Sequence, residues 1–387
     1  MAPSAATLRV LADLVAFDTT SRNSNLALID YVRDYLAALG VDSTLVHDAT
    51  GRKANLWATI GPGGDGGLVL SGHTDCVPVD GEVWASDPFV VTERDGRLYG
   101  RGTADMKGFL ACVLAAVPAM VAAPLAHPIH LAFSHDEEIG CVGVRSLLDE
   151  LRRNGPRPAM CLVGEPTSMQ VVTGHKGGRA YRCHVTGLSA HSSLAPQAVN
   201  AIEFAAEIIA FIRALARDLA AGPRDEAFDL PHSTVSTGLI EGGAAINIVP
   251  ASCTFTYEFR NLIEVDQATI QASVEAFARD VLLPEMRGVH AGADIAFEPI
   301  YEYPAHAIDA GDPFVTLMKR LTGRNDHAKV AYGAEAGLFR RELGVATVLC
   351  GPGQIAVAHK PDEWVGTDQL EACERVLAAI VDHLRAD

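Results

Sequence analysis

Along the first 164 residues, short apolar strand patterns alternate with longer helical patterns. The strands are expected at 55–60, 68–71, 129–134 and 160–164. The helices are expected at 8–17, 26–39, 142–152 and from Lys107 onward. Parallel strands need crossover connections of this kind. The order therefore predicts an α/β domain whose mixed, mainly parallel sheet is covered by helices.

The middle of the chain has a different order of elements. Strand patterns are expected at 179–186, 234–240, 253–260 and 294–301, with long helices at about 198–219 and 268–283. Strand, helix, strand, strand, helix, strand is the order of a ferredoxin-like α+β domain. After Pro304 the α/β pattern returns and ends in a helix at 367–384. Since 387 residues are enough for two domains, we expect one α/β domain interrupted by an inserted α+β domain.

The composition is that of a folded, acidic protein. Hydrophobic residues make up 49% of the chain and charged residues 20%, which excludes disordered and collagen-like classes. Lys and Arg number 31 against 48 Asp and Glu, so the formal net charge is -17. Such a field repels phosphate backbones and anionic lipids. We therefore expect neither nucleic-acid binding nor binding to a membrane surface.

Three features favour a cytoplasmic protein. The eight cysteines are scattered, with neither a C-x-x-C pair nor a dense disulfide framework. Charged residues such as Arg9 and Asp13 interrupt the N-terminal segment, which is expected to form an amphipathic helix and not an export signal. The charge-free stretch 109–126 is long enough to suggest a membrane span, but it is Ala-rich and divided by Pro118 and Pro124. We expect a buried core helix there.

Histidine and acidic residues follow the predicted strands. His73 and Asp75 come after the strand at 68–71, and Glu165 comes after the strand at 160–164. In α/β sheets, ligands bind at the carboxyl ends of the strands. An imidazole and a carboxylate two residues apart can serve as a metal ligand and the acid that orients it. The alternative is a purely structural role.

Three further segments supply candidates. Asp105 ends the glycine-rich sequence YGRGTAD and precedes a helix, so capping that helix is its alternative role. Glu137 and Glu138 stand side by side after the strand at 129–134, where two carboxylates are costly unless a cation or a shared proton relieves them. A solvated turn is the alternative there. His359 follows a glycine-rich turn, where a histidine is often structural.

Five of these residues together make up a set of metal ligands: His73, Asp105, Glu138, Glu165 and His359. A dinuclear hydrolytic site needs imidazole and carboxylate ligands, with one carboxylate bridging two ions about 3.5–4 Å apart. The sequence therefore predicts a site for two divalent metal ions.

The segments around these residues resemble the co-catalytic zinc aminoacylase and metallopeptidase family, which includes acetylornithine deacetylase, succinyl-diaminopimelate desuccinylase and glutamate carboxypeptidase. Five stretches are more similar to acetylornithine deacetylase than to its siblings: FSHDEEIGCVGV at 133–144, AHSSLAPQAVNAIEFAA at 190–206, NIVPASCTFTYEFR at 247–260, AYGAEAGLF at 331–339 and CGPGQIAVAHKPDEW at 350–364. They occur in the family's order over nearly the whole chain, and every ligand position is present.

The resemblance implies a role for each matching residue. The five metal ligands would divide as follows: His73 and Glu165 on one ion, Glu138 and His359 on the other, and Asp105 bridging both. Asp75 would orient His73. Glu137 would take a proton from the attacking water and later deliver it to the leaving amine, as a general base near an acidified water can. The expected metal is Zn²⁺, with Co²⁺ as the alternative.

The resemblance also implies how the chain is divided. The catalytic domain would comprise 1–178 and 304–387, and the inserted lid and dimerisation domain 179–303. From that inserted domain, His191 would stabilise the oxyanion across the interface of a homodimer. A structural histidine is the alternative for this position.

The activity implied is removal of the acetyl group from N2-acetyl-L-ornithine, a small molecule of arginine biosynthesis. Asn247 and Arg260 would bind its acidic end, because arginine suits a bidentate carboxylate contact. A cationic side chain such as ornithine's would favour a nearby acid, which Glu335 or the pair Asp362 and Glu363 could supply. The alternatives are hydrolysis of N-acetylcitrulline, succinyl-diaminopimelate or another N-acylamino acid. A non-catalytic protein that binds metal or amino acids belongs to a different class, and a general base beside a complete ligand set argues against it.

Overall fold

The computed structural model describes residues 2–386, and the chain divides into two compact units. The first comprises the chain up to Gly174, His306–Lys329 and the chain from Ala334 onward. The second comprises His175–Ala305 and Val330–Gly333 and therefore interrupts the first. The domain limits expected at residues 179 and 303, and the lid role of the middle segment, stay predictions.

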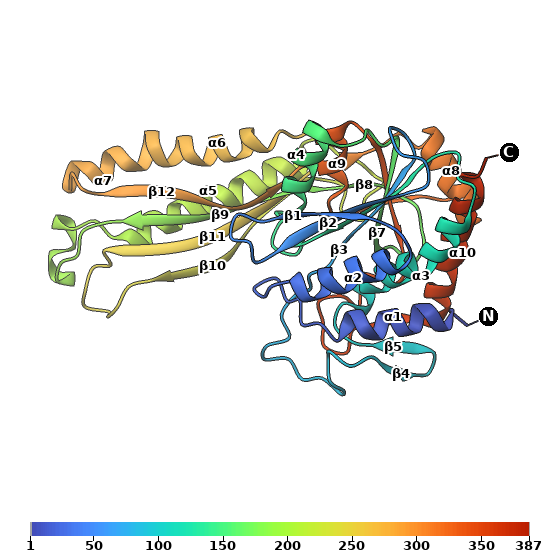
Figure 1. Ribbon diagram of the computed structural model, residues 1–387. Coiled ribbons are helices and arrows are strands. Elements are labelled where there is room, and N and C mark those ends of the chain that lie inside the picture. Colours follow the sequence, from blue (N-terminus) through green and yellow to red (C-terminus); the bar gives the residue numbers. More distant parts are fainter. Residues whose placement is uncertain (1, 387) are drawn as a thin grey trace. The chain divides into compact units, whose positions relative to one another are not determined.

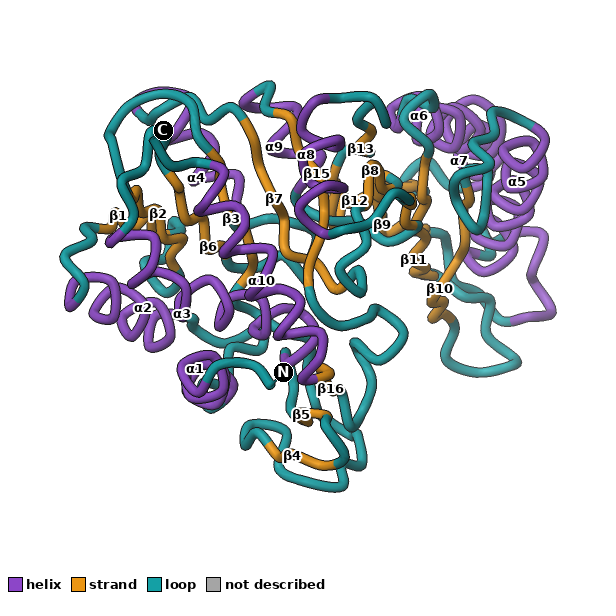
Figure 2. Tube along the Cα trace, turned by 90° about the vertical axis from the view of Figure 1, so that its right-hand side faces the viewer, coloured by secondary structure: helices purple, strands orange, loops and turns teal. Residues whose placement is uncertain are grey.

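Within the described residues, the first unit is built on a nine-stranded sheet (Figures 1 and 2). Its strands, in spatial order, are β1 (Ser43–His47), β2 (Ala54–Ile60), β6 (Ile129–Ser134), β3 (Leu68–His73), β7 (Met160–Pro166), β15 (Ala346–Gly351), β8 (Val172–His175) and β13 (His306–Ala307), with β14 (Ala328–Val330) beside β8. The central strands β6, β3, β7 and β15 run parallel, and β1, β2 and β8 pair antiparallel with their neighbours. This confirms the expected α/β class with a mixed sheet.

Helices cover the sheet of the first unit on both faces. They are α1 (Ala5–Val15), α2 (Leu26–Ala38), α3 (Gly108–Ala122), α4 (Val144–Asn154), α8 (Pro313–Thr322), α9 (Ala336–Leu343) and α10 (Thr367–His383). In Figure 1, α1 and α2 lie below the strands and α4 and α9 above them. Because β3 and β6 are covered on both faces, all their residues are buried, as expected for central parallel strands.

The apolar helix α3 is part of the core. The stretch Thr103–Ala122 is long and apolar enough to cross a membrane by length and composition, yet 72% of it is buried inside the protein. Phe109, Leu110 and Val113 belong to the main hydrophobic cluster of the first unit. The buried helix expected here is confirmed, although it ends at Ala122 and not at residue 126.

A small three-stranded sheet joins two distant parts of the first unit. It consists of β16 (Trp364–Gly366), β5 (Arg97–Tyr99) and β4 (Thr92–Arg94), in that order. Trp364 pairs with Tyr99, so the segment that follows His359 lies beside the segment that precedes Asp105.

The second unit contains a four-stranded antiparallel sheet and three α-helices among its described residues. The strands, in spatial order, are β10 (Thr234–Gly242), β11 (Ser252–Asn261), β9 (Gly177–Thr186) and β12 (Asp294–Tyr303). The helices are α5 (Ala201–Ala221), α6 (Gln267–Phe277) and α7 (Leu283–Val289). Along β11, buried and half-exposed residues alternate, since only one face of this sheet packs on helices. The chain order strand–helix–strand–strand–helix–strand matches the ferredoxin-like expectation.

Candidate metal centre

The parallel strands of the first unit bring their carboxyl ends to one edge of the sheet. His73 is the last residue of β3, and Glu165 lies near the end of β7. Glu137 and Glu138 follow the end of β6 at Ser134 after two intervening residues. Both β3 and β7 are longer than the sequence patterns predicted, so His73 and Glu165 lie within strands and not beyond them. Within the sheet, His73 pairs with Ser134, and Pro166, next to Glu165, pairs with Gly351.

Asp105 reaches the same edge from the turn Thr103–Lys107, which leads into α3. Its own backbone angles are not helical, and the residue at the N-cap position of α3 is Lys107, so the helix-capping alternative for Asp105 is wrong. Instead, the backbone N–H groups of Ala104 and Asp105 donate to Oε1 of Glu363, at 2.9 and 3.1 Å. This contact positions the Asp105 carboxylate.

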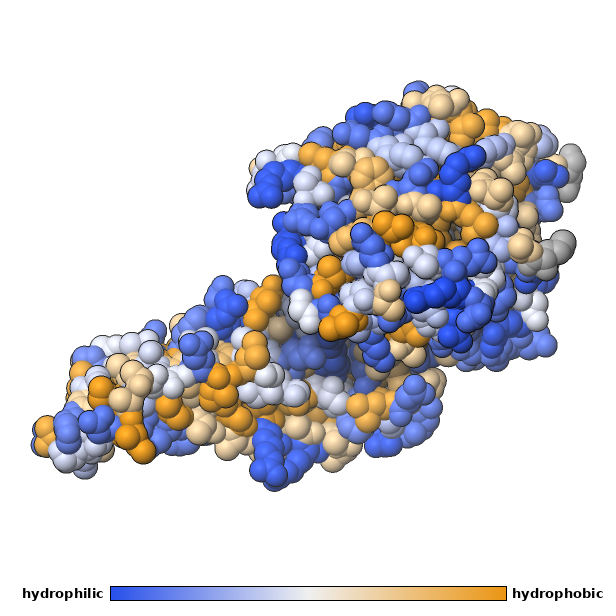
Figure 3. Space-filling view, turned by 90° about the horizontal axis from the view of Figure 1, so that it is seen from below, coloured by the Kyte–Doolittle hydropathy of each residue, from blue (hydrophilic) through white to orange (hydrophobic). Residues whose placement is uncertain are grey.

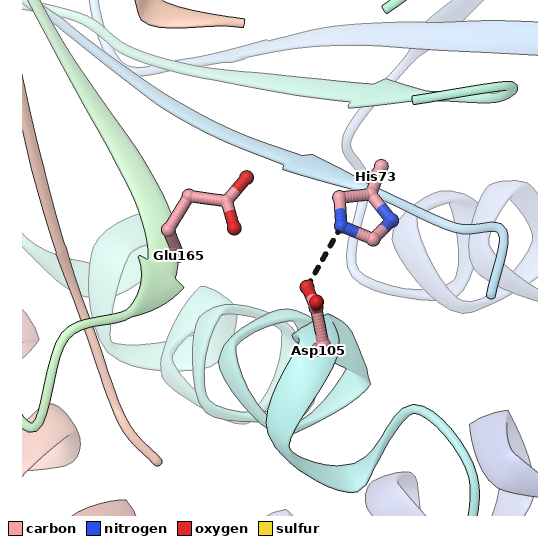
Figure 4. Close-up of side chains that lie close together, drawn as sticks. All are labelled: His73, Asp105 and Glu165. Carbon is pink, nitrogen blue, oxygen red and sulfur yellow. Dashed lines mark hydrogen bonds and ion pairs between the residues drawn. The ribbon is translucent and has the colours of Figure 1, made fainter. Parts of the chain in front are cut away.

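Two groups of potential ligands share Asp105. His73, Asp105 and Glu165 form one, and Asp105, Glu138 and His359 form the other, with the ligand atoms of each group within 4.8 Å of one another. Figure 4 shows the first group, in which all three side chains point toward a common centre. Nε2 of His73 lies 3.1 Å from one Asp105 carboxylate oxygen, and Nε2 of His359 lies 3.1 Å from the other. Asp105 is therefore placed to bridge two cations.

The His359–Glu138 pair completes the second group. Nε2 of His359 lies 2.9 Å from Oε2 of Glu138. Two donors at zinc-like bond lengths on one tetrahedral ion are about 3.3 Å apart. The observed separations of 2.9 to 3.1 Å are close to that value. The geometry of both groups fits divalent cations.

The electrostatics of the cluster also favour bound cations. Burial and neighbouring carboxylates raise the pKa of Glu137 to about 8 and that of Glu138 to about 7, and raise the pKa of Glu165 well above its ordinary value. Burial alone would also raise the pKa of Asp105, but its contacts with His359 and His73 hold it well below the usual range. A cation placed among these groups would relieve the repulsion between the acids.

Two carboxylate oxygens at the centre test whether a metal fits. Among the described residues, the buried Oε1 atoms of Glu138 and Glu165 have no hydrogen-bond partner. A buried, charged oxygen without a partner is costly in free energy. Each belongs to one of the two ligand groups, so a divalent cation in each group would satisfy both atoms. The residues present fit two metal ions.

His73 is oriented by Asp75, although not mainly through the side chain. Nδ1 of His73 lies 3.0 Å from the backbone carbonyl oxygen of Asp75 and 3.6 Å from its carboxylate. A carbonyl oxygen only accepts, so Nδ1 carries a proton, and Nε2 is the nitrogen that bonds to the Asp105 carboxylate and would bind a metal ion in place of its proton. The Asp75 carboxylate accepts instead from Ser21 Oγ at 2.7 Å and from the backbone N–H groups of Glu137 and Glu138 at 3.1 and 3.3 Å.

Of the acids suggested for a substrate ammonium group, Glu335 and Glu363 are enclosed, whereas Asp362 is half-buried and accepts from the N–H of Ala85 at 2.9 Å, and its role stays a prediction. Glu335, directly before α9, is buried and accepts hydrogen bonds from Ser134 Oγ at 2.6 Å and Ser71 Oγ at 3.4 Å. Glu363 is buried and pairs with Arg101 at 2.9 Å. Because both carboxylates are enclosed and already bonded inside the protein, they are not available to a substrate ammonium group.

The other three predicted site residues belong to the second unit. His191 is exposed, and its Nδ1 accepts from the backbone N–H of Ser193 at 3.2 Å. Asn247 is exposed, and its carbonyl oxygen accepts from the N–H of Ser192 at 3.0 Å. Arg260, in β11, pairs with Glu258 at 2.9 Å. Their roles stay predictions.

Arg101 is the functional candidate that the sequence did not single out. Its side chain is fully buried, although arginine is seldom buried without paired charges. The signal was present, since Arg101 stands between two glycines, four residues before Asp105. Nothing in the local pattern shows, however, that its partners lie 19 and 262 residues away.

Comparison with known proteins agrees with this geometry. The family model described as peptidase family M20/M25/M40 matches residues 69–383. The chain belongs to this family. Acetylornithine deacetylase of Pasteurella multocida is 32% identical over 382 residues, which cover 97% of each protein. Acetylornithine deacetylase of Myxococcus xanthus is 34% identical, with 96% of each protein covered. The chain is accordingly a metal-dependent hydrolase of family M20/M25/M40.

Solved structures of the family have the same fold. An M20 family metallo-carboxypeptidase from Sulfolobus solfataricus superposes with a TM-score of 0.77 at 20% identity, covering 97% of this chain and 98% of the other. The match includes the inserted unit, because nearly the whole chain is covered.

Proposed function

We propose that this M20 protein removes the acetyl group from N2-acetyl-L-ornithine and releases L-ornithine and acetate, a step of arginine biosynthesis. The observation that carries the proposal is the pair of ligand groups that share Asp105, with the carboxylate of Glu137 beside them. The choice of substrate is supported by the near full-length similarity to acetylornithine deacetylases.

The proposed centre holds two divalent ions, which we propose to be Zn²⁺, with Co²⁺ as a functional substitute. His73 and Glu165 would hold one ion, Glu138 and His359 the other, and Asp105 would contact both. When bound, the ions supply the Lewis acidity that polarises the amide carbonyl and acidifies a water molecule. Imidazole and carboxylate ligands suit zinc, although metal availability also decides which ion is bound.

Glu137 is the proposed general base and acid. The thiol of Cys141 donates to its Oε1 at 3.2 Å, which leaves Oε2 as the oxygen that takes the proton of the attacking water. The hydroxyl group of that water bonds to the acetyl carbon while the amide C–N bond breaks. Glu137 then delivers the proton to the leaving amine nitrogen, so that acetate and the free amino acid are produced.

The second unit would supply the contacts to the rest of the substrate. We assign to His191 the stabilisation of the oxyanion, and to Asn247 and Arg260 the binding of the substrate carboxylate. Arg260 is suited to this task because its guanidinium group stacks over the rings of Tyr301 and Tyr303, with centroids 5.9 and 5.6 Å away, which limits its rotamers. Closure of this unit as a lid belongs to the same proposal.

A homodimer through the second unit is also proposed. Strand β10 forms an edge of its sheet, and Leu239 and Ile240 on it are 70% and 56% exposed. Figure 3, which views the molecule from below, shows apolar atoms at the surface of this part of the chain. An unpaired edge with exposed apolar side chains is a site for pairing with a second copy.

We place the enzyme in the cytoplasm. All eight cysteines are free and buried, as is typical of proteins in a reducing compartment.

A panel of substrates tests the proposed specificity. Steady-state kcat/KM would be measured for N2-acetyl-L-ornithine, N-acetylcitrulline, succinyl-diaminopimelate and other N-acylamino acids. We expect the highest value for N2-acetyl-L-ornithine. A clear preference for any other member would overturn the substrate assignment and leave the hydrolytic class intact.

A single substitution tests the proposed base. Glu137→Gln keeps the size of the side chain and removes its ability to take a proton. We expect kcat to fall by at least about 10²-fold, in the range of lost acid–base catalysis, while the metal content stays at the wild-type value. Full activity in this variant would contradict the mechanism.

The dimer is tested by sedimentation of the wild type and of Leu239→Lys. A charge at the edge strand should shift the protein toward the monomer. A wild-type protein that sediments as a monomer at micromolar concentration would contradict the dimer.

A further inference from the structure

Arg101 is the hub of a buried ion-pair network in the first unit. Its Nη1 donates to Oε2 of Glu363 at 2.9 Å and to the carbonyl oxygen of Lys360 at 3.1 Å. Its Nη2 donates to Oε2 of Glu82 at 2.6 Å and to the carbonyl oxygen of Pro78 at 3.3 Å. The side chain is 0% exposed, and every one of these partners lies outside its own segment.

The partner Glu363 connects this network to the metal centre. While its Oε2 pairs with Arg101, its Oε1 accepts from the backbone N–H groups of Ala104 and Asp105. Its own carbonyl oxygen accepts from the N–H of Gly100 at 2.9 Å. Glu363 therefore holds the turn that carries Asp105 with both its backbone and its side chain.

In the sequence, each member of the Arg101–Glu363 pair lies four residues from a proposed metal ligand. Arg101 precedes Asp105 by four residues, and Glu363 follows His359 by four residues. Through Lys360 and Glu363, Arg101 contacts the segment of His359 on one side and the segment of Asp105 on the other. The pair thus connects the segment that carries His359 with the segment that carries Asp105.

The second ligand group depends on this connection more than the first does. His73 and Glu165 of the first group lie in neighbouring, hydrogen-bonded strands. His359 lies in a turn outside any strand, with a positive φ of 58° and a side chain that is 48% exposed. Since no sheet holds His359, its position relative to Asp105 is set by tertiary contacts such as those of Arg101.

We infer that Arg101 and Glu363 are a pair of positioning residues that set the spacing between Asp105 and His359 and thereby decide the affinity of the second metal ion. The inference rests on the proposed metal centre. Buried charges of this kind are strongly coupled, because removal of one partner leaves the other uncompensated. Loss of either member should therefore loosen the same ligand group.

The test uses the metal-loaded full chain. Wild type, Arg101→Met and Glu363→Gln are dialysed against rising chelator concentrations, and the metal per chain is measured by mass spectrometry, with thermal unfolding as a check of folding. Arg97→Met is the matched control. Arg97 lies in the neighbouring strand β5, is exposed and stacks over Trp364 at 4.1 Å, so this variant removes a nearby arginine that is not part of the buried network.

We expect both network variants to lose one of their two ions at a chelator concentration about 10–100-fold lower than the wild type, which is the usual effect of removing an outer partner of a metal site. The other ion, which His73 and Glu165 still hold from neighbouring strands, should be lost less readily than the affected one, although Asp105 contacts both. Arg97→Met should behave as the wild type. If Arg101→Met does not fold, the result for Glu363→Gln decides the test, because its amide oxygen can still accept from the N–H groups of Ala104 and Asp105.

A double substitution identifies which ion is affected. Adding Arg101→Met to His359→Ala, which already lacks the imidazole of the second group, should change the metal content no further. Adding it to Glu165→Ala should remove metal. Equal weakening of both ions, or wild-type metal binding in both network variants, would overturn the inference. A wild-type chain that binds fewer than two ions would instead contradict the proposed metal centre.

Discussion

Replacement of Asp75 by Asn changes one oxygen of a fully bonded carboxylate into an amide nitrogen. In the native protein, Oδ1 accepts from the N–H of Glu137, and Oδ2 accepts from Ser21 Oγ and from the N–H of Glu138. An asparagine can present its oxygen to only one of the two backbone N–H groups. Its NH₂ group must then face the other, so that two donors oppose each other.

The cost of this change follows from the contacts that are lost. A buried N–H without a partner costs about 1–3 kcal/mol, and bonds to a neutral acceptor are weaker than bonds to a carboxylate. The free energy of unfolding should therefore fall by about 2–4 kcal/mol in total. Because Asp75 orders the Glu137–Glu138 backbone and adjoins His73, metal affinity should fall by about 10–100-fold as well.

The assay for Asp75→Asn is urea unfolding followed by tryptophan fluorescence, combined with metal analysis. The three tryptophans, Trp57, Trp84 and Trp364, all belong to the first unit, so fluorescence reports that unit alone. Ser21→Ala is the matched control, because it removes one donor and leaves the charge, at a cost of about 1 kcal/mol. An Asp75→Asn protein no less stable than Ser21→Ala, with wild-type metal content, would refute the reasoning.

Three other outcomes are expected. Dialysis against a chelator should abolish hydrolysis, and Zn²⁺ or Co²⁺ should restore it; activity that survives complete metal removal would contradict the metal centre. Burial lowers the pKa of His306 to about 4, and its Nε2–H donates to the carbonyl oxygen of Thr347 at 2.8 Å. A histidine whose pKa is lower in the folded than in the unfolded protein stabilises the fold above the unfolded pKa, and this stabilisation is lost as the pH falls. Because of His306, the free energy of unfolding of the wild type should fall by about 2 kcal/mol between pH 7 and pH 5. In His306→Gln, the free energy of unfolding measured with urea should not show this fall between the two pH values. An equal fall in the variant would contradict the role assigned to His306. Gly164→Ala would place a Cβ 2.1 Å from the ring of Phe109, directly before Glu165. Its unfolding free energy should fall by about 1–3 kcal/mol, with reduced metal content, and an unchanged urea midpoint would argue against this packing constraint.

The central strands could be predicted because strands that are buried on both faces consist of continuous apolar runs. Strand β6 was expected at 129–134 and occupies Ile129–Ser134, where every residue is buried. The short strands β1, β8 and β13, which lie at or near the edges of the sheet, were not predicted. They carry no continuous apolar run, since the neighbours that pair with them come from distant parts of the chain.

The helices show the same division between local and distant causes. The helix expected at 268–283 continues through a π-helical turn to Val289, which the apolar pattern alone did not indicate. The limits of α3 were predicted only in part. Its end at Ala122, just before Pro124, follows from proline's effect on the preceding backbone.

By itself, the sequence determined the chemistry that this protein can carry out: two imidazoles and three carboxylates at strand ends or in turns, and one further acid beside them. Such residues are recognisable because their types and their places after apolar strands are local properties. Only the tertiary structure decided how they are held. In the structure, the carbonyl oxygen of Asp75 accepts from Nδ1 of His73 and so fixes a proton there. Glu335 and Glu363 are buried, and Arg101 lies between the segments of Asp105 and His359. Apart from the contact of His73 with Asp75, these contacts join residues far apart in the chain. Because a buried charge is costly unless it is paired, the fold brings such partners together, and no local pattern records them.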